Sequence, residues 1–257
     1  ASRDLASVGG MVNNNSGGEK SLEFGKTEDF VESLKFVFAD GIQRTVKPLG
    51  PEELKVKMNQ DDFEGRVYRQ IYKLIEANYD LIKNAKPKVS KNSTGYNLWD
   101  VWDRQKGIFD LTKLIVGSQG TLGLVTDIKF KLVPVRPHSG LLVLFMKDID
   151  DLGEVINKVL EKKPATFESF DDQTLLLSIR FMPSFLKLLG VKRFIKLLVT
   201  LIPDGLQLLR GIPKLILMVE FNGETEEEVR QKIHDLHFDL AKYRARYEIN
   251  GFEETPT

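Results

Sequence analysis

The segment 7–18 most constrains what this chain can fold into. It carries four glycines and three consecutive asparagines, and it follows neither the helical nor the strand period. Glycine permits left-handed backbone angles and close approach to a ligand, while N–H groups and asparagine amides can bind phosphate or ring acceptors. We interpret the segment as a cradle for a pyrophosphate or a flavin, or as a flexible loop that binds nothing.

A second glycine cluster occupies residues 115–126. Gly117, Gly120 and Gly123 recur at intervals of three between two runs of β-branched residues. This spacing predicts a tightly wound loop between strands, and a hairpin without a ligand is the alternative. The spacing differs from the GxGxxG and GxxxxGK[ST] signatures of other nucleotide-binding loops.

Composition excludes several classes of partner and chemistry. Lysine plus arginine equals aspartate plus glutamate at 37 each, so no net charge attracts nucleic acid. The absence of cysteine removes disulfides, thiolate nucleophiles and a cysteinyl link to a cofactor within this chain. No apolar run is long enough to span a bilayer, and the first residues lack a methionine and a signal core. We expect a truncated start and a cytoplasmic protein.

Periodicity predicts mixed α and β structure with a boundary near Pro137. Residues 33–46 alternate apolar and polar around Asp40 and Gly41, which predicts a hairpin. Residues 63–82 have helical spacing, and Asp61 or Asp62 is placed to cap the helix. We further predict strands at 127–133, 141–146, 166–170 and 215–221, and helices at 150–162 and from 224 onward. The fold class is therefore α+β.

Five motifs in order resemble the FAD-linked oxidase family, whose flavin domain is of the PCMH or vanillyl-alcohol-oxidase type. This family includes D-lactate, glycolate and D-2-hydroxyglutarate dehydrogenases and the ether-lipid synthase. The motifs are residues 7–18, 24–29 (FGKTED), 38–41 (FADG), 92–98 (NSTGYNL) and 117–126 (GSQGTLGLVT). The resemblance implies that residues 1–137 are the C-terminal portion of the FAD-binding domain. Residues 138–257 would be a partial, ferredoxin-like cap domain that binds substrate.

By this resemblance the two glycine clusters hold FAD, largely through backbone groups. Position 119 is glutamine where the family commonly has glutamate, a change that a backbone-binding loop tolerates. The 92–98 motif would lie near the flavin, with Asn92 and Tyr96 expected to be structural hydrogen-bonding residues. The implied cofactor-binding residues are Ser2, Ser7, Val8, Gly9, Gly10, Asn13, Asn14, Asn15, Gly17, Gly18, Gly117, Ser118, Gln119, Gly120, Thr121, Leu122, Gly123 and Val125.

The family's first phosphate loop and its histidine-containing catalytic segment are expected before Ala1 and beyond Thr257. Catalytic residues are therefore unassigned, and we expect the chain by itself to be inactive. His138, His234 and His237 lack the pattern of a metal site, so no metal is predicted.

The implied activity is dehydrogenation of a small 2-hydroxy acid by hydride transfer to FAD, with a quinone or an electron-transfer protein as acceptor. Another flavin reaction is the first alternative: aldonolactone or sugar oxidation, or alkyl transfer. A truncated, non-catalytic module for interaction or membrane association is the second.

Residues 181–203, from Phe181 to Pro203, are apolar and basic and contain no acidic residue. Such a stretch can lie at a membrane interface, and a pair of packed helices is the alternative. The first interpretation predicts peripheral contact with the inner face of the membrane.

Overall fold

The computed structural model describes residues 5–89, 92–181, 184, 212–240 and 246–254. Backbone contacts divide the chain into two units. Unit 1 comprises residues 1–18 and 25–134, and unit 2 comprises residues 19–24 and 135–257. The segment 181–203, predicted above to contact a membrane, lies almost wholly outside the described residues. Within the described part, no helix is long and apolar enough to cross a membrane.

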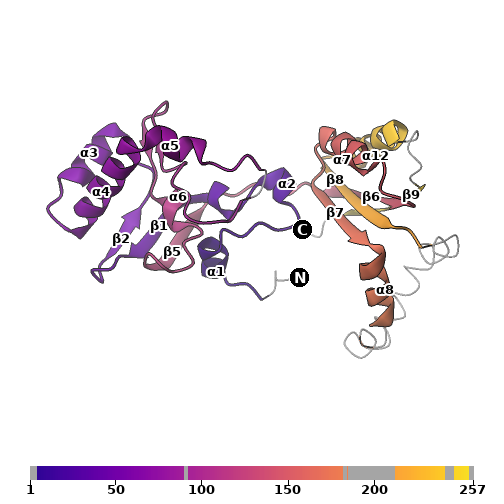
Figure 1. The fold of residues 1–257 in the computed structure, drawn as a ribbon, viewed down its shortest axis with the longest axis horizontal. Helices are drawn as coiled ribbons and strands as arrows, with labels where there is room; N and C mark the ends of the chain where they lie inside the picture. The colour runs from indigo at the N-terminus through magenta and orange to yellow at the C-terminus, as the bar shows by residue number, and fades with distance from the viewer. Residues whose placement is uncertain (1–4, 90–91, 182–183, 185–211, 241–245, 255–257) are drawn as a thin grey trace. The chain divides into compact units, whose positions relative to one another are not determined.

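Unit 1 is built on a three-stranded antiparallel sheet in the order β2–β1–β5 (Figure 1). The predicted hairpin is present as β1 (Val31–Val37) and β2 (Gln43–Val46), joined through Asp40 and Gly41. Gly41 has the positive φ, 77°, that this tight turn requires. β5 (Leu124–Phe130) pairs with the other edge of β1, so the second glycine cluster leads directly into the central sheet.

Helices flank this sheet and close its core. The predicted helix at 63–82 is interrupted at Asn78, which separates α4 (Phe63–Ala77) from α5 (Tyr79–Asn84). Asp62 caps α4 by accepting the Gly65 N–H at 2.8 Å, as predicted. The remaining elements of unit 1 are α1 (Val8–Asn13), η1 (Thr27–Asp29), α3 (Pro51–Asn59), β3 (Trp102–Asp103), β4 (Ile108–Phe109) and α6 (Thr112–Ile115).

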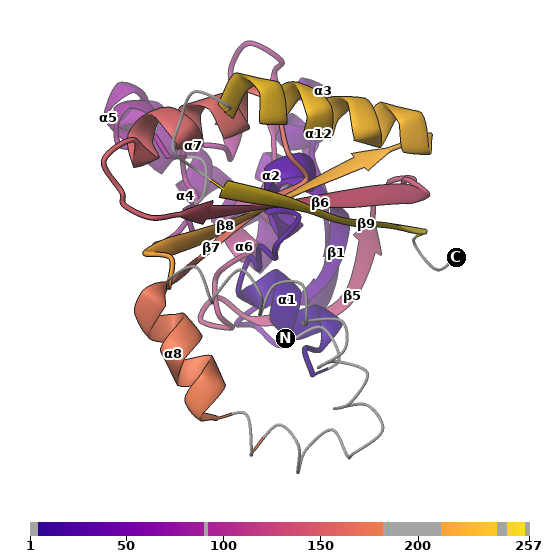
Figure 2. The same ribbon diagram turned by 90° about the vertical axis from the view of Figure 1, so that its right-hand side faces the viewer.

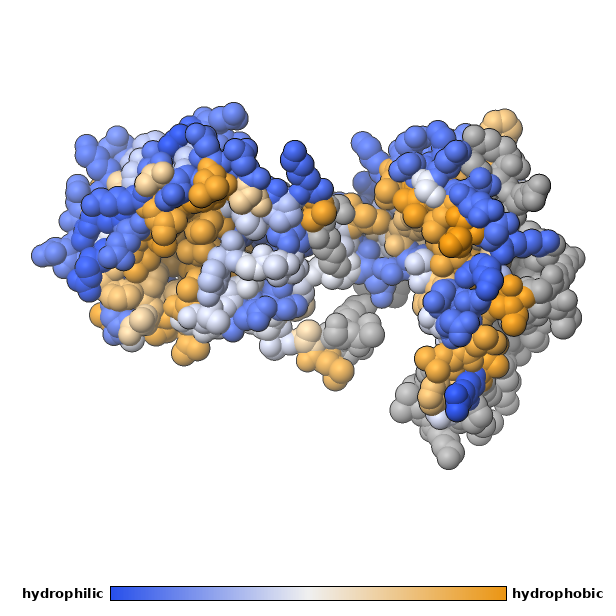
Figure 3. Space-filling view, in the orientation of Figure 1, coloured by the Kyte–Doolittle hydropathy of each residue, from blue (hydrophilic) through white to orange (hydrophobic). Residues whose placement is uncertain are grey.

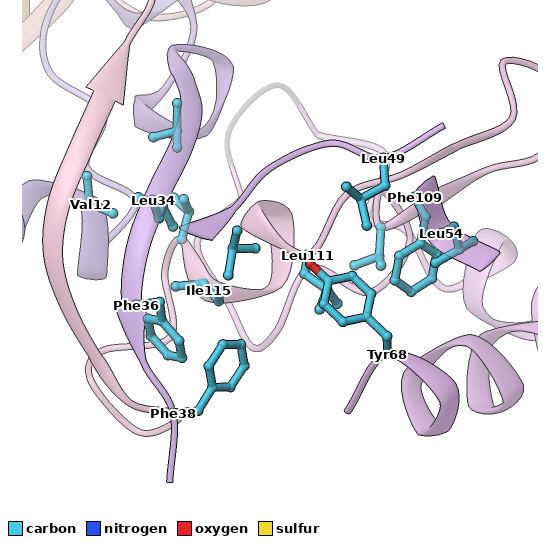
Figure 4. Close-up of a cluster of buried hydrophobic side chains, with 14 of the residues drawn as sticks. Val12, Leu34, Phe36, Phe38, Leu49, Leu54, Tyr68, Phe109, Leu111 and Ile115 are labelled. Carbon is cyan, nitrogen blue, oxygen red and sulfur yellow. The ribbon is translucent and has the colours of Figure 1, made fainter. Parts of the chain in front are cut away.

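Among the described residues, the buried core of unit 1 combines eleven aliphatic side chains with four aromatic ones. Phe36 and Phe38 meet edge to face at 5.0 Å on the strand side, and the rings of Tyr68 and Phe109 lie 6.0 Å apart on the helix side (Figure 4). Phe36 is 1% exposed and Tyr68 is 0% exposed. Burial of this area supplies the main stabilisation of the unit.

Unit 2 is a four-stranded antiparallel sheet in the order β7–β8–β6–β9. Its strands are β6 (His138–Met146), β7 (Thr166–Asp171), β8 (Leu215–Gly223) and β9 (Arg246–Glu254). The helices α7 (Leu152–Glu161) and α12 (Glu226–Leu240) lie on one face of the sheet, while α8 (Asp172–Arg180) follows β7 away from it (Figure 2). This is the strand order and helix placement of a ferredoxin-like sandwich.

Apolar residues alternate along β6 and β8 so that one face of the sheet meets the helices. Leu142 and Leu144 of β6 pack with Val155 of α7 and Ile233 of α12, and all four are nearly inaccessible to solvent. Each strand and helix predicted after Pro137 is present, with bounds shifted by a few residues.

One segment from the N-terminal part of the sequence joins unit 2. The short helix α2 (Ser21–Phe24) carries Glu23, whose carboxylate accepts a hydrogen bond from the buried Asn222 amide at 2.8 Å. Lys20 forms an ion pair with Glu220 of β8 at 3.1 Å. The chain therefore passes between the units three times: after Gly18, after Phe24 and after Pro134.

Gly123 packs so closely against β1 that no side chain fits at this position. An added Cβ would lie 2.4 Å from the Val37 carbonyl oxygen and 2.6 Å from the Phe36 ring, and φ is +154°. Gly123→Ala is expected to reduce the free energy of unfolding by roughly 2–4 kcal/mol, measured by chemical denaturation. Gly120→Ala is the control, because Gly120 has φ +77° but open space around it. It should cost only about 1–2 kcal/mol of backbone strain. Equal losses in the two variants would contradict the packing argument.

Candidate functional site

The first glycine cluster, residues 7–18, is called loop A. It is not wholly irregular, since residues 8–13 form the six-residue helix α1. Ser7 caps this helix by accepting the Gly10 N–H at 3.1 Å, and the Asn13 amide donates to the Gly9 carbonyl oxygen at 2.9 Å. At Asn15 the backbone turns into the left-handed region with φ +46°, which ends the helix and directs the chain toward η1.

Residues 117–123 of the second glycine cluster are called loop B. It follows a short helix, α6, and not the strand that the sequence predicted, and it leads into β5. Gly117, Gln119 and Gly120 all have positive φ angles, of 84°, 54° and 77°. Glutamine rarely adopts this conformation, so the surrounding bonds must hold it there.

Loops A and B are joined directly by main-chain hydrogen bonds. The Gly117 N–H donates to the Val12 carbonyl oxygen at 2.9 Å, and the Gln119 N–H donates to the Asn13 carbonyl oxygen at 2.8 Å. An added Cβ at Gly117 would lie 3.1 Å from the Asn15 Cβ, so glycine is needed for the loops to approach this closely. The structure therefore brings the two predicted clusters together as one surface.

A third segment, η1, connects loop A to the 92–98 motif. The Glu28 N–H donates to the Asn15 side-chain oxygen at 3.0 Å, and the Thr27 hydroxyl donates to the Ser16 carbonyl oxygen at 2.8 Å. On its other side, the Glu28 carboxylate accepts a hydrogen bond from the Asn97 amide at 2.9 Å. Loop A is thus held from both flanks, by loop B and by η1.

The 92–98 motif in turn contacts loop B. The hydroxyl oxygens of Tyr96 and Thr121 lie 2.7 Å apart, and Thr121 also donates to the Ser118 carbonyl oxygen at 2.6 Å. The Asn92 side chain accepts the Thr94 N–H at 3.1 Å. Asn92 and Tyr96 are therefore hydrogen-bonded within the protein, as the sequence interpretation expected. Loop A, η1, the motif and loop B form a closed circuit of hydrogen bonds.

A cavity of about 600 Å³ opens beside this circuit within unit 1. Asn15 and Gly117 contribute to its wall, so the paired loops border the space directly. Its other walls come from η1 and the 92–98 motif, with Lys26 just before η1, Asp110 just before α6 and Lys113 within α6. The lining is mainly polar, which suits a ligand that carries phosphates and hydroxyl groups.

Two observations test whether the loops fit a bound dinucleotide. The Asn13 side-chain oxygen and the Ser118 hydroxyl are buried, and neither has a hydrogen-bond partner within the protein. A Cβ added at Gly9, Gly18 or Gly120 would meet no atom within 4 Å, so the main chain is open to an approaching group at these positions. Neither Asn13 nor Ser118 lines the cavity, and oxygens on Gln60 and Tyr68 are likewise buried and unpartnered. The open glycine backbone is therefore the feature that fits a nucleotide cofactor.

Asp110 is a buried carboxyl group in the cavity wall and is 7% exposed. Its Oδ1 accepts hydrogen bonds from the Thr112 N–H at 2.9 Å and from the Thr112 hydroxyl at 2.6 Å. Burial raises the pKa of Asp110 above its ordinary value of 3.8, and the two bonds from Thr112 and the charge of Lys113 oppose that rise.

Three of the predicted cofactor-binding residues are not among those that the structure places on the paired loop surface. Ser2 lies outside the described residues, Leu122 packs against the core of unit 1, and Val125 is part of β5.

The motifs at 24–29 and 92–98 contain Glu28 and Asn97, but the sequence assigns a role to neither residue and does not point to Asp110 or Lys113. The Asn97 amide donates to Glu28 across 69 residues, and Lys113 donates to Glu28 across 85 residues. Asp110 is distinguished by its burial, which only the fold decides. No local sequence pattern could therefore have identified these residues.

The histidines do not gather at this cavity. His138 begins β6, while His234 and His237 lie on α12 with ring centroids 6.5 Å apart. Within the described part of the chain, no cluster of three or more potential metal ligands occurs.

The sequence is similar to several known proteins. Residues 1–47 match the family described as FAD binding domain. D-2-hydroxyglutarate dehydrogenase from Pseudomonas putida is 30% identical over 175 residues, covering 68% of this chain and 17% of the relative. The Escherichia coli enzyme of the same name is 26% identical, covering 90% and 21%. Glycolate oxidase subunit GlcD from Bacillus subtilis is 29% identical, covering 68% and 27%.

Among solved structures, alkyldihydroxyacetonephosphate synthase superposes with a TM-score of 0.56 at 15% identity, covering 95% of this chain and 33% of that one. This likeness shows the fold, which is that of an α+β flavoprotein of the PCMH type with a ferredoxin-like second unit. On the sequence matches we assign the chain to the FAD-linked oxidase family, with FAD as the cofactor. The chain spans between 17% and 27% of the length of the three relatives named above.

The raised pKa of Asp110 predicts a specific pH dependence of stability. Because the folded chain binds this proton more tightly than the unfolded chain, the contribution of Asp110 is most favourable below its ordinary pKa of 3.8. It is lost as the pH rises through the raised folded pKa. Asp110→Asn keeps an oxygen to accept from Thr112 and cannot ionise. Unfolding measured from pH 4 to pH 8 should show that this variant gains stability relative to wild type as the pH rises. A constant difference between the two proteins would refute the assignment.

Proposed function

We propose that this chain is part of an FAD-dependent oxidoreductase that dehydrogenates a small 2-hydroxy acid. The observation that carries the proposal is the pairing of loops A and B, with open space at Gly9, Gly18 and Gly120, beside a polar cavity. The named relatives support the substrate class, because they are dehydrogenases or oxidases of D-2-hydroxyglutarate and glycolate.

In this proposal the two loops bind FAD through main-chain N–H groups and through the side chains of Asn13 and Ser118. When bound, FAD accepts a hydride from the carbon that bears the substrate hydroxyl, and the protein supplies binding and orientation. Loop B presents its backbone in a left-handed conformation that the circuit of hydrogen bonds has already fixed, so little ordering remains to be done on binding.

The two parts of the sequence take different roles. Residues 1–137 form the C-terminal portion of the FAD-binding domain, and residues 138–257 form part of the substrate, or cap, domain. We place the catalytic residues outside this chain, which by itself would not turn over substrate. The electron acceptor is a quinone or an electron-transfer protein.

The alternative functions differ in how the flavin is used. Alkyl transfer and the oxidation of an aldonolactone or a sugar are the alternative flavin reactions for a chain of this fold, because a shared fold does not fix the reaction. A non-catalytic module is the alternative from a different class. Binding and reduction of FAD by defined substrates separate these possibilities.

The full-length protein is expected to show the paired absorbance bands of a bound flavin. These bands should bleach anaerobically when D-lactate, glycolate or D-2-hydroxyglutarate is added, and L-lactate is the control for substrate handedness. Bands that persist with every hydroxy acid would reject the substrate class and leave the cofactor. A protein that stays colourless after incubation with FAD would reject the proposal entirely.

We also propose peripheral membrane contact near α8, at the inner face of the membrane, for an otherwise cytoplasmic protein. Hydrophobic residues are exposed along this helix (Figure 3), where Leu177 is 52% and Ile179 is 47% exposed. The sequence that follows, residues 181–203, combines apolar and basic residues without an acid. Apolar insertion together with attraction to anionic headgroups would stabilise such contact.

Sedimentation with vesicles tests this contact. The full-length protein should co-sediment with vesicles containing phosphatidylglycerol and should do so less with phosphatidylcholine alone. The double substitution Leu176→Ser and Leu177→Ser should reduce the bound fraction severalfold, because each removes exposed apolar area from α8. Val56→Ser, which alters an exposed apolar residue of α3, is the control. Recovery equal to a vesicle-free sample would rule the contact out.

A further inference from the structure

We infer that Glu28 is a positioning residue that sets the spacing of loops A and B for FAD. The inference rests on the proposed function and names a residue that does not belong to either glycine loop. Glu28 lies in η1, beside loop A, and lines the cavity. Its role would be to hold the binding surface in shape, without contact to the reacting atoms.

Four hydrogen bonds or ion pairs converge on this one residue. Its N–H donates to Asn15, its carboxylate accepts from Asn97 at 2.9 Å, and the same carboxylate lies 2.8 Å from the Lys26 ammonium. The Glu28 carbonyl oxygen accepts a hydrogen bond from Lys113 at 2.6 Å. Glu28 is therefore the point at which loop A, the 92–98 motif and the chain just before loop B are tied together.

The charge on Glu28 is enclosed, which makes it hard to replace. Its side chain is 14% exposed and that of Lys26 is 12% exposed, and Lys26 also donates to the Asn92 carbonyl oxygen. A pair this sheltered differs from a surface ion pair, because loss of one partner leaves the other charge without compensation. Removing the Glu28 charge would therefore release Lys26 and, through it, the 92–98 motif.

The connection from Glu28 to the cofactor surface runs through Asn15. Asn15 is 6% exposed and has a left-handed backbone with φ +46°, a conformation that asparagine adopts more readily than most residues. The hydrogen bond from the Glu28 N–H fixes its side chain there. The Asn15 Cβ is the atom nearest to the open side of Gly117. A shift of Asn15 would therefore move loop B relative to loop A and misalign the N–H groups that approach FAD.

The test compares FAD affinity with stability in the full-length protein. Glu28→Gln should weaken FAD binding by about tenfold or more, measured by titrating the apoprotein with FAD, because charge-assisted hydrogen bonds are lost. The control is Glu53→Gln. Glu53 also pairs with a lysine at 2.8 Å, but its side chain is 53% exposed and lies outside the cavity. The affinity of the Glu53→Gln variant for FAD should stay within about twofold of wild type.

Two further variants test the hydrogen bond between Glu28 and Asn97 and keep the test decisive if Glu28→Gln alone misfolds. Asn97→Ala is a milder change that should also weaken FAD binding. Glu28→Gln combined with Asn97→Asp reverses donor and acceptor across the same contact, keeps the net charge, and should recover part of the lost affinity. The absorbance spectrum of the bound flavin should shift in Glu28→Gln and return toward wild type in the paired variant.

The outcomes separate this inference from the proposed function. If Glu28→Gln and Asn97→Ala lower the stability of the apoprotein while FAD affinity stays within about twofold of wild type, Glu28 is only structural and the inference is overturned. If wild type itself fails to bind FAD, the proposed function fails first. Weakened affinity in both variants with unchanged affinity in Glu53→Gln supports positioning.

Discussion

Two main-chain hydrogen bonds, from Gly117 and Gln119 to Val12 and Asn13, are the interaction on which the site depends. They join segments that are far apart in sequence, and neither segment has enough local structure to hold its shape. The helix in loop A has six residues, which is too short to be stable by itself. Loop B passes through positive φ angles at Gly117, Gln119 and Gly120 and needs external support.

The two units are stabilised in different ways. Unit 2 follows the usual logic of a sandwich, in which alternating apolar residues of β6 and β8 meet the apolar faces of α7 and α12. In unit 1 an apolar core holds the sheet and helices, while the loops at the cavity are held by a polar circuit through Glu28, Asn97 and Tyr96. Polar circuits specify geometry more sharply than apolar packing, because each bond has a required distance and direction.

The loops and the cavity wall contain polar groups that are costly to bury. The Asn13 oxygen and the Ser118 hydroxyl have no partner, and Asp110 is held where burial raises its pKa. A fold selected for stability alone would avoid such groups, since each lowers the free energy of unfolding. Further unpartnered buried oxygens among the described residues, on Gln60 and Tyr68, also lie outside the cavity lining, so such groups are not confined to the two loops.

Sequence by itself determined the secondary structure where a local rule applied. Period-two alternation with Asp40 and Gly41 predicted the hairpin, and Asp62 predicted the start of α4, because these signals act over a few residues. It also predicted the order of strands and helices after Pro137, and the two glycine clusters as a cofactor surface by resemblance to a family. It was wrong about the local structure of loop A, where α1 forms because Ser7 caps it and Asn13 bonds back to Gly9. It was also wrong about the element before loop B.

Only the tertiary structure decided which distant segments meet: loop A with loop B, Glu28 with Asn97, and Asp110 with the cavity. The physical reason is that these contacts are single hydrogen bonds between residues without periodicity, and their partners are selected by the packed fold and not by neighbours in sequence.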